Sequence, residues 1–499
     1  MATGEDQSLK TRTARTLKWN VIDRVAAQAL YAVTGIILAN LLSPQDFGLV
    51  GAVLVFQAFA SLLVDSGFSS ALIQRKEPTR ADYSTVLWFN LSIATAIYVI
   101  LYFCAPLIAD CFQGDRRIIP LSRVMFLTFI LNALSIVQVN RLTKRMDMKP
   151  VAVADTVGLA AGAAAGIWLA LDGQGAWAIV WQSIANAAVK AIVLWSTQRW
   201  LPLPVFSWKI LRSYFSIGSR MMFTSFLNTV FLNLYSFFIG NRVGMVSLGY
   251  YTQSDKWSKM GIMSVYQVLT SSFLPALSAV QDDPERFNRV SAKMNRFTSY
   301  IIFPAVCFLV ALASPLFHLL FDTKWDPSVI LFQLLLVRGI FTVFIGYYNN
   351  VLLALGHART IMWMEILRDG VAIAALVATL PYLAVSFPED PVYGLTVMLW
   401  GQLGASALTC AVTLRIVSRL TSRPVRQYLA DMAPYVALSL VIAFVMWFTG
   451  TFIISPSLSC AVLSAEAVIL YAGINYLSGS RIQRDVFAFI CGSKKADIG

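Results

Sequence analysis

The stretch that decides the fold is WNVIDRVAAQALYAVTGIILANLLSPQDFG, residues 19–48. Residues 19–42 are apolar enough, and long enough, to form a helix that crosses a bilayer, which takes about 20 residues. Residues 43–48 contain a proline and end in glycine, which is typical of a turn. The stretch therefore predicts a first transmembrane helix followed by a short turn.

The first half of this predicted helix carries polar residues along one side. Asn20, Asp23, Arg24 and Gln28 follow spacings of three and four, which bring residues to the same face of a helix. A charge at membrane depth is costly unless it faces protein, water or a partner. We therefore expect this face, with Arg24 on it, to line an internal cavity.

The whole chain has the composition of a membrane protein. Hydrophobic residues make up 58% of it and charged residues 13%, and the mean hydropathy is +0.67. Soluble proteins have about 25% charged residues. Long apolar runs recur along the chain, so we expect one all-α polytopic membrane protein with about fourteen transmembrane helices. The predicted spans are 19–42, 47–73, 83–109, 118–140, 151–171, 175–197, 217–240, 260–281, 297–321, 329–353, 360–384, 392–415, 432–454 and 457–478.

The distribution of Lys and Arg tests this map. With a cytoplasmic N-terminus, the predicted inside segments hold 27 basic residues and the outside segments hold 6. Basic residues concentrate in cytoplasmic loops, so the alternation predicts that both termini are cytoplasmic. The same rule accounts for the net charge of +13, so a nucleic-acid partner is not expected.

A weak internal repeat divides the chain. Residues 43–49 follow the first predicted span and residues 244–251 follow the seventh, and each segment contains an apolar residue followed by glycine. Parallel repeats of this kind occur in transporters. We expect an N-terminal half at 1–206, a C-terminal half at 207–416, and two additional spans with a cytoplasmic tail at 417–499.

Three local patterns predict packing. Residues 207–215 and 282–296 are amphipathic and basic, as in helices that lie in the cytoplasmic headgroup layer, but the favoured interpretation is that they only connect neighbouring spans. Gly158, Gly162 and Gly166 form a ladder of small residues that lets another helix approach closely.

The residue inventory argues against an enzyme. The two histidines, His318 and His357, have no carboxylate or cysteine at ligand spacing, and the six cysteines have no metal-ligand spacing. Cys104 and Cys111 lie near one membrane face, where they either pair or remain free thiols. No metal site and no catalytic residue is predicted. The first apolar run is too long for the core of a signal peptide and is expected to remain as a span.

Charges inside the predicted spans are the candidates for function. Arginine presents a planar fork of donors that suits phosphate, so Arg24, Arg220 and Arg338 predict an anionic, phosphorylated substrate. The alternative is that each arginine pairs with a carboxylate one turn away and only holds helices together. Polar residues expected beside these arginines in the cavity are Gln28, Asn228 and Gln57.

Acidic residues in the spans have two interpretations. Asp23, Asp65 and Glu466 either bind a coupling cation, H⁺ or Na⁺, or form salt bridges. Asp155, Lys190 and Arg368 lie near predicted span ends, where long side chains reach the membrane surface.

Several segments together resemble a known family. They are residues 41–48, 65–76, 248–256, 274–278 and 354–359, and they occur in the right order over most of the chain. The chain resembles the polysaccharide-exporter branch of the MOP superfamily, the Wzx-type flippases, and is most similar to exporters of the colanic acid, succinoglycan or teichuronic acid kind.

The resemblance implies both a fold and an activity. The fold would be two six-helix bundles, as in MATE-like transporters, plus two C-terminal helices. The activity would be flipping of an undecaprenyl-pyrophosphate-linked oligosaccharide across the bacterial inner membrane, with Arg24 and Arg220 engaging the pyrophosphate. Membrane lipids, a polysaccharide polymerase and its co-polymerase are the expected partners. Two alternatives stay open: a cation-coupled drug or small-molecule antiporter of the same fold, and a membrane enzyme of polysaccharide assembly.

Overall fold

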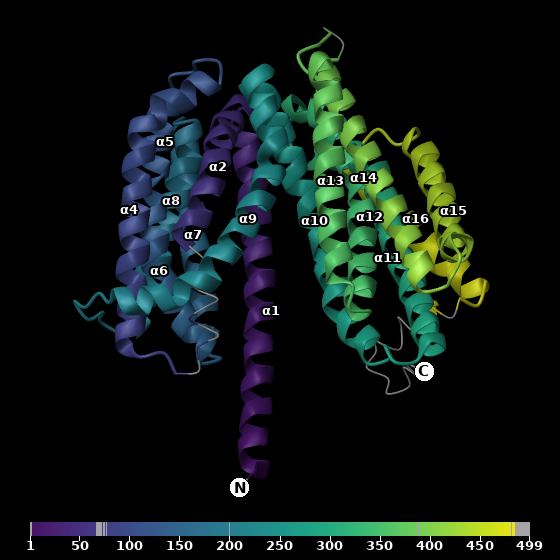
Figure 1. The fold of residues 1–499 in the computed structure, drawn as a ribbon. Helices are drawn as coiled ribbons and strands as arrows, with labels where there is room; N and C mark the ends of the chain where they lie inside the picture. Colours follow the sequence, from purple (N-terminus) through teal and green to yellow (C-terminus); the bar gives the residue numbers. More distant parts are fainter. Residues whose placement is uncertain are drawn as a thin grey trace. The chain divides into compact units, whose positions relative to one another are not determined.

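The computed structural model contains helices and no strand in the part of the chain that it describes (Figure 1), which confirms the all-α prediction. It describes residues 2–65, 72, 75, 77–198, 200–387, 390–480 and 482–484, without the side chains of 2–18, 20–21, 63–65, 213–225, 227–228, 268 and 270–271. Twelve of the described helices are long and apolar enough to cross a membrane. The two remaining predicted spans, 217–240 and 360–384, coincide with further helices of 35 and 22 residues.

The chain divides into two compact units, Met1–Gly249 and Tyr250–Gly499. The predicted division at residues 206 and 416 stays a prediction. The first unit contains α1 (Ala2–Leu41), α2 (Pro44–Asp65), α4 (Arg80–Cys111), α5 (Ile118–Met125), α6 (Leu127–Lys144), α7 (Lys149–Leu171), α8 (Ala176–Gln198), α9 (Trp208–Arg242) and the start of α10 (Met245–Ser278). The second unit contains the rest of α10, α11 (Pro284–Leu320), α12 (Pro327–Ala354), α13 (Ala358–Thr379), α14 (Tyr393–Leu420), α15 (Val425–Gly450) and α16 (Pro456–Leu477).

The predicted turn after α1 is a tight link into α2. The Ser43 hydroxyl donates to Asp46 Oδ2 at 2.6 Å. The Ser43 amide donates to Asp46 Oδ2 at 3.0 Å, and the Asp46 amide donates to Ser43 Oγ at 3.3 Å. This reciprocal arrangement is a capping box. Pro44 occupies the first helical position, where its missing N–H costs nothing. The sequence of the turn therefore both ends α1 and starts α2.

The two segments predicted to be repeats lie against each other within the first unit. A Cβ on Gly48 would be 1.7 Å from the carbonyl oxygen of Met245, and a Cβ on Gly249 would be 1.9 Å from the carbonyl oxygen of Pro44. Each glycine stands four residues after the first residue of its helix, α2 or α10. The contact is thus reciprocal, and only glycine lets the two backbones come this close.

The glycine ladder of α7 packs as predicted. Cβ atoms on Gly158, Gly162 and Gly166 would each lie 2.6–3.0 Å from atoms of Gln182 or Asn186 on α8. The absence of side chains along this face therefore lets α7 and α8 approach closely.

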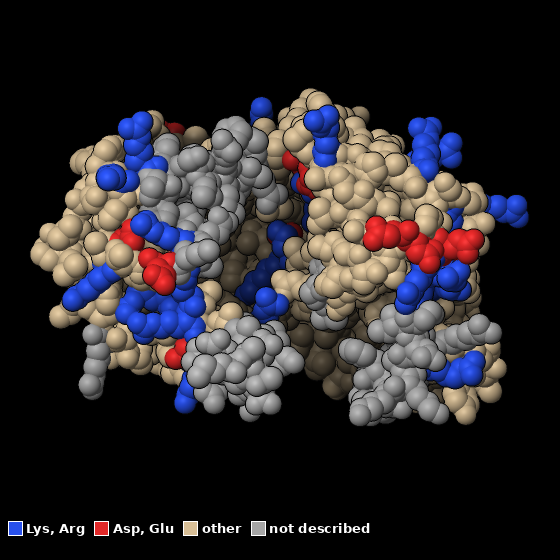
Figure 2. Space-filling view, turned by 60° about the horizontal axis from the view of Figure 1, so that its bottom comes forward, with Lys and Arg blue, Asp and Glu red and all other residues tan. Residues whose placement is uncertain are grey.

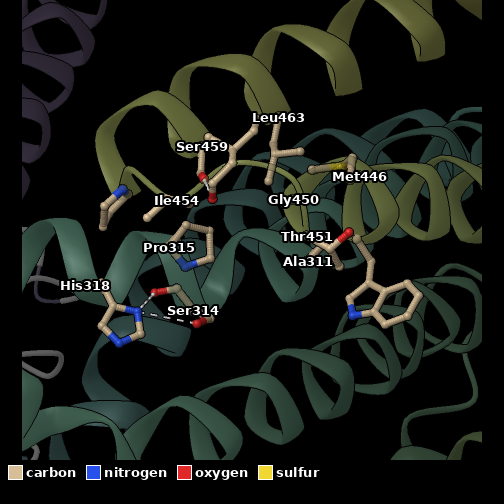
Figure 3. A pocket seen from close by; sticks show the side chains of 13 residues that line it. Ala311, Ser314, Pro315, His318, Met446, Gly450, Thr451, Ile454, Ser459 and Leu463 are labelled. Carbon is tan, nitrogen blue, oxygen red and sulfur yellow. Dashed lines mark hydrogen bonds between the residues drawn. The ribbon is translucent and has the colours of Figure 1, made fainter.

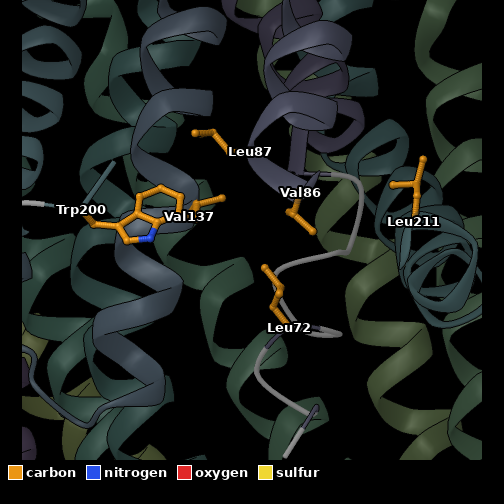
Figure 4. Packing of buried hydrophobic residues seen from close by; sticks show 6 residues of the cluster. All are labelled: Leu72, Val86, Leu87, Val137, Trp200 and Leu211. Atoms are coloured by element: carbon orange, nitrogen blue, oxygen red, sulfur yellow. The ribbon is translucent and has the colours of Figure 1, made fainter. Parts of the chain in front are cut away.

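The two predicted surface helices are instead the first turns of α9 and α11. Leu211, expected on a lipid-facing side, is 3% exposed and belongs to a core cluster with Leu72, Val86, Leu87, Val137 and Trp200 (Figure 4). Phe287 at the start of α11 is 2% exposed. Leu211 and Phe287 thus pack on protein, whereas Trp208, in the same amphipathic segment as Leu211, is 69% exposed.

Candidate functional site

Three helices of the first unit, α1, α7 and α8, bring charged side chains together. Lys190 Nζ of α8 lies 2.5 Å from Asp155 Oδ1 of α7, and the two side chains are 28% and 24% exposed. Asp23 of α1 interacts electrostatically with both residues and with Arg24. The Oδ1 atom of Asp23 is buried and has no hydrogen-bond partner in the described structure. Asp23, on the predicted polar face of α1, therefore lies near the charged pair of Asp155 and Lys190.

The Lys190–Asp155 pair gives a stability prediction. Removing one partner of a buried ion pair costs about 3–5 kcal/mol, and the partial exposure of these side chains reduces our expectation to about 2 kcal/mol. Lys190→Met should thus lower the thermal stability of the purified protein in detergent. Lys190→Met combined with Asp155→Leu should recover most of the loss. Equal stability of the single and double variants would contradict an ion pair that matters for folding.

The other predicted site residues of the first unit have different surroundings. Arg24 and Gln28 are exposed on α1, and Gln57 of α2 donates through Nε2 to Thr128 Oγ1 at 3.1 Å. The Gln57 Oε1 atom is buried and has no partner in the part of the chain described. Three predicted side chains lie outside the described residues: Arg220, Asn228 and Asp65. Convergence of Arg24 and Arg220 on one cavity stays a prediction.

Arg338 is a half-buried cation on α12 of the second unit. Among the described residues it forms no ion pair, and its Nε atom is buried with no hydrogen-bond partner. Thr342 and Asn349 follow it at spacings of four and eleven, which places the three on one face of the helix. For this arginine the structure does not support the alternative of a carboxylate partner one turn away, so its donors are available to an anion.

A charged cluster on α13 lies close to this face. Arg368 lies 2.5 Å from Glu365 Oε2 and 2.9 Å from Asp369 Oδ1. Asn349 Nδ2 donates to Glu365 Oε1 at 3.4 Å, and Tyr266 of α10 interacts electrostatically with the pair. These residues were not predicted as a site. The available signal was the spacing of three and four, which brings these charges to one side of an apolar helix.

Glu466 of α16 accepts a hydrogen bond of 3.0 Å from Thr449 Oγ1 of α15. Its Oε2 atom is buried without a partner in the described structure, where Glu466 also forms no ion pair. A carboxylate held this way is available to a cation, and Glu466 stays a candidate for ion coupling.

A pocket of about 320 Å³ lies between α11, α15 and α16 (Figure 3). His318 lines it, with Nδ1 at 2.9 Å from the Ser314 carbonyl oxygen and 3.4 Å from the Ser314 hydroxyl, and Nε2 at 3.2 Å from Asp326 Oδ1. A carbonyl oxygen only accepts hydrogen bonds, so in the shorter contact Nδ1 carries the proton and donates it to the Ser314 carbonyl oxygen. A protonated Nδ1 is unable to take a proton from the Ser314 hydroxyl. This serine, histidine and aspartate therefore do not form a nucleophile and base.

Comparison with known proteins identifies the family. A family model described as "Polysaccharide biosynthesis protein" matches residues 37–330, more than half of the chain. The chain belongs to this polysaccharide biosynthesis family. The match starts within α1 and ends within α12, so it includes both repeat segments and all helices of the first unit after α1.

Similar proteins include one named as a transport protein and two named as polysaccharide or lipopolysaccharide biosynthesis proteins. The chain is 27% identical to the succinoglycan biosynthesis transport protein ExoT of Rhizobium meliloti over 360 residues, which cover 71% of this chain and 72% of the relative. It is 23% identical to the teichuronic acid biosynthesis protein TuaB of Bacillus subtilis, covering 74% and 77%. It is 24% identical to the lipopolysaccharide biosynthesis protein WzxC of Escherichia coli, covering 67% and 68%.

Solved structures establish the fold of this family member. The lipid II flippase MurJ in an inward closed conformation matches with a TM-score of 0.69 at 14% identity, covering 94% of this chain and 99% of that one. An inward-facing multidrug resistance MATE family transporter of the MOP superfamily matches with a TM-score of 0.59 at 14% identity, covering 81% and 99%. The protein is thus a polytopic membrane protein with a MurJ- and MATE-like transporter fold.

Proposed function

We propose that this protein is a flippase that moves an undecaprenyl-pyrophosphate-linked oligosaccharide from the cytoplasmic to the outer leaflet of the bacterial inner membrane. The product would feed the assembly of a surface or secreted polysaccharide. The observation that carries the proposal is the combination of membership in a polysaccharide biosynthesis family with a fold shared with a lipid II flippase over 94% of the chain.

Moving this substrate across the membrane requires groups that replace the water around its phosphates, and the chain carries residues suited to that role. A pyrophosphate bearing sugars does not cross hydrocarbon unaided, because moving an unpaired charge there costs many kcal/mol. Arginine donors at membrane depth would replace water around the phosphates while the lipid tail stays in the bilayer. Arg24, Arg220 and Arg338 are the proposed phosphate-binding residues, and Gln28, Gln57 and Asn228 the proposed hydrogen-bonding residues for the sugars.

Alternating access, with the substrate site open to one side at a time, is the proposed mechanism. A proton or sodium ion bound by Asp23, Asp65 or Glu466 would couple transport to an ion gradient. The orientation we propose has both termini in the cytoplasm, where the substrate enters. A polysaccharide polymerase and its co-polymerase are proposed partners that would take up the product.

A cation-coupled antiporter is the second candidate. The intramembrane carboxylates Glu365, Asp369 and Glu466, together with the MATE-like fold, favour it. An antiporter for cationic drugs needs no phosphate-binding arginine, whereas Arg338 has no acidic partner in the described structure. A membrane enzyme of polysaccharide assembly would be indicated by glycosyl transfer catalysed by the purified protein.

Binding of substrate analogues separates these candidates. We expect the purified protein to be stabilised against heat by undecaprenyl pyrophosphate more than by undecaprenol, because only the former carries the charges that arginines recognise. Thermal unfolding in detergent with each lipid is the measurement. Equal stabilisation by the two lipids, or stabilisation only by cationic drugs, would contradict a phosphate-binding site.

A further inference from the structure

Arg141 of α6, in the first unit, is a buried cation that has no acidic partner among the described residues. It is 7% exposed, and among the described residues it forms no ion pair. Its guanidinium lies 4.7 Å from the centre of the Trp200 ring and 5.8 Å from that of Tyr83. Nη1 donates to Gln138 Oε1 at 3.3 Å. Two aromatic faces and one amide therefore hold a charge that is normally paired with a carboxylate.

Two more arginines lie beside Arg141. Arg80 and Arg145 are both exposed and repel Arg141 electrostatically. Arg80 is fixed in place, since its Nε and Nη2 donate to the Leu201 carbonyl oxygen at 3.2 and 2.8 Å. Three like charges held close together cost free energy, and an anion placed among them would offset that cost.

The nearby acidic groups do not neutralise these arginines. Asp82 is 1% exposed, pairs with Arg75 at 2.8 Å and caps α4 through Thr79. Glu77 and Asp147 are exposed in the adjoining turns. Residues 75–82 and 138–149 together contain seven basic residues and three acidic ones. A basic excess therefore remains at this end of the first unit.

An apolar edge adjoins the three arginines. The connection from α8 to α9 is held on α4 by hydrogen bonds from the Leu203 and Ser207 amides to side chains of α4 and from the Trp88 indole to the Leu203 carbonyl oxygen. Trp200 is buried against Arg141, but four large apolar side chains of residues 201–208 point outward. The exposed fractions are 69% for Leu201, 45% for Val205, 50% for Phe206 and 69% for Trp208. Apolar and Trp side chains exposed next to basic ones are typical of a surface that enters the headgroup layer.

We propose that Arg80, Arg141 and Arg145 bind the phosphate of an anionic phospholipid, with the apolar edge of residues 201–208 resting on its acyl chains. Figure 2 looks onto the end of the molecule that we expect to face the cytoplasm and shows Lys and Arg side chains gathered there. A phosphodiester supplies the missing negative charge, and only a lipid also covers the apolar edge. Free phosphate would contact the arginines and leave the apolar edge uncovered. The site does not depend on what the protein transports.

The test is a titration of the purified full-length protein with phosphatidylglycerol and with phosphatidylcholine, followed by native mass spectrometry. A basic residue next to an anionic membrane contributes about a factor of five to affinity. Arg80→Gln/Arg145→Gln should therefore weaken phosphatidylglycerol binding roughly 30-fold and leave phosphatidylcholine binding unchanged. Arg145→Gln alone, which removes no side-chain hydrogen bond of the described structure, should weaken it about fivefold if the double variant does not fold.

The matched control is Arg286→Gln/Arg289→Gln, which removes two exposed arginines at the start of α11, on the same predicted side of the membrane. We expect it to retain phosphatidylglycerol binding. If both double variants weaken phosphatidylglycerol binding equally, binding depends only on the net charge of the protein, and the proposed arginine site is wrong. Unchanged binding in Arg80→Gln/Arg145→Gln would also overturn it. Displacement of the lipid by inorganic phosphate at similar concentrations would assign the site to free phosphate instead.

Discussion

Replacing Gly48 with alanine is expected to destabilise the protein by about 3 kcal/mol or more, at the upper end of what overpacking costs. The new Cβ would lie 1.7 Å from the Met245 carbonyl oxygen, so a backbone segment has to move. Gly249→Ala should have a similar effect, because its Cβ would lie 1.9 Å from the Pro44 carbonyl oxygen. Thermal unfolding of the purified variants in detergent measures both changes.

The control for this prediction is Gly404→Ala in α14. Apart from its own helix backbone, no atom of the described residues lies within 4 Å of the Cβ position at Gly404, so alanine there should be neutral or slightly stabilising through its higher helix propensity. Because Gly48 and Gly249 belong to one contact, the double variant should lose less stability than the sum of the two single losses. A Gly48→Ala protein as stable as Gly404→Ala would contradict the reciprocal contact.

The second large effect is expected at Arg338. If its donors bind a substrate phosphate, Arg338→Ala should lower the rate of lipid-linked oligosaccharide translocation roughly 100-fold, since charged hydrogen bonds contribute up to about 3 kcal/mol. Arg338→Lys should be intermediate, because lysine keeps the charge and loses the planar fork. Translocation by proteoliposomes containing each variant is the measurement.

Stability separates a binding role of Arg338 from a structural one. The described structure gives this arginine no ion pair, so Arg338→Ala should unfold at the same temperature as the unchanged protein or higher. Arg368→Ala, which leaves Glu365 and Asp369 together without their cation, should unfold at a lower temperature. A loss of stability in Arg338→Ala as large as that in Arg368→Ala would point to a structural arginine.

Much of the fold follows from local sequence. Apolar runs set the positions of the helices, and the segments 43–49 and 244–251 indicated a repeat from their shared apolar-Gly pairs. The structure adds that these segments touch, which was not predictable because the pattern does not say which helices are neighbours. The free thiols of Cys104 and Cys111 likewise follow from tertiary geometry rather than from their spacing.

The candidate site was less predictable than the fold. An amphipathic pattern identifies an apolar face but not whether lipid or protein covers it, which is why Leu211 and Phe287 were expected at the membrane surface. The partners of Asp155 and Arg141 come from other helices or a distant loop, so a single sequence gives no signal for Lys190 or Trp200 beside them. Arg24, Gln28 and Gln57 stay predictions as substrate-binding residues.

The most direct test of the proposed function is leaflet-to-leaflet movement of a pyrophosphate-linked oligosaccharide lipid in proteoliposomes containing the purified protein. The account predicts that the labelled sugar moves between leaflets only when protein is present, and that Arg24→Ala and Arg338→Ala each abolish most of this movement while the proteins remain folded. Absence of movement with the unchanged protein, or full movement with both variants, would contradict it.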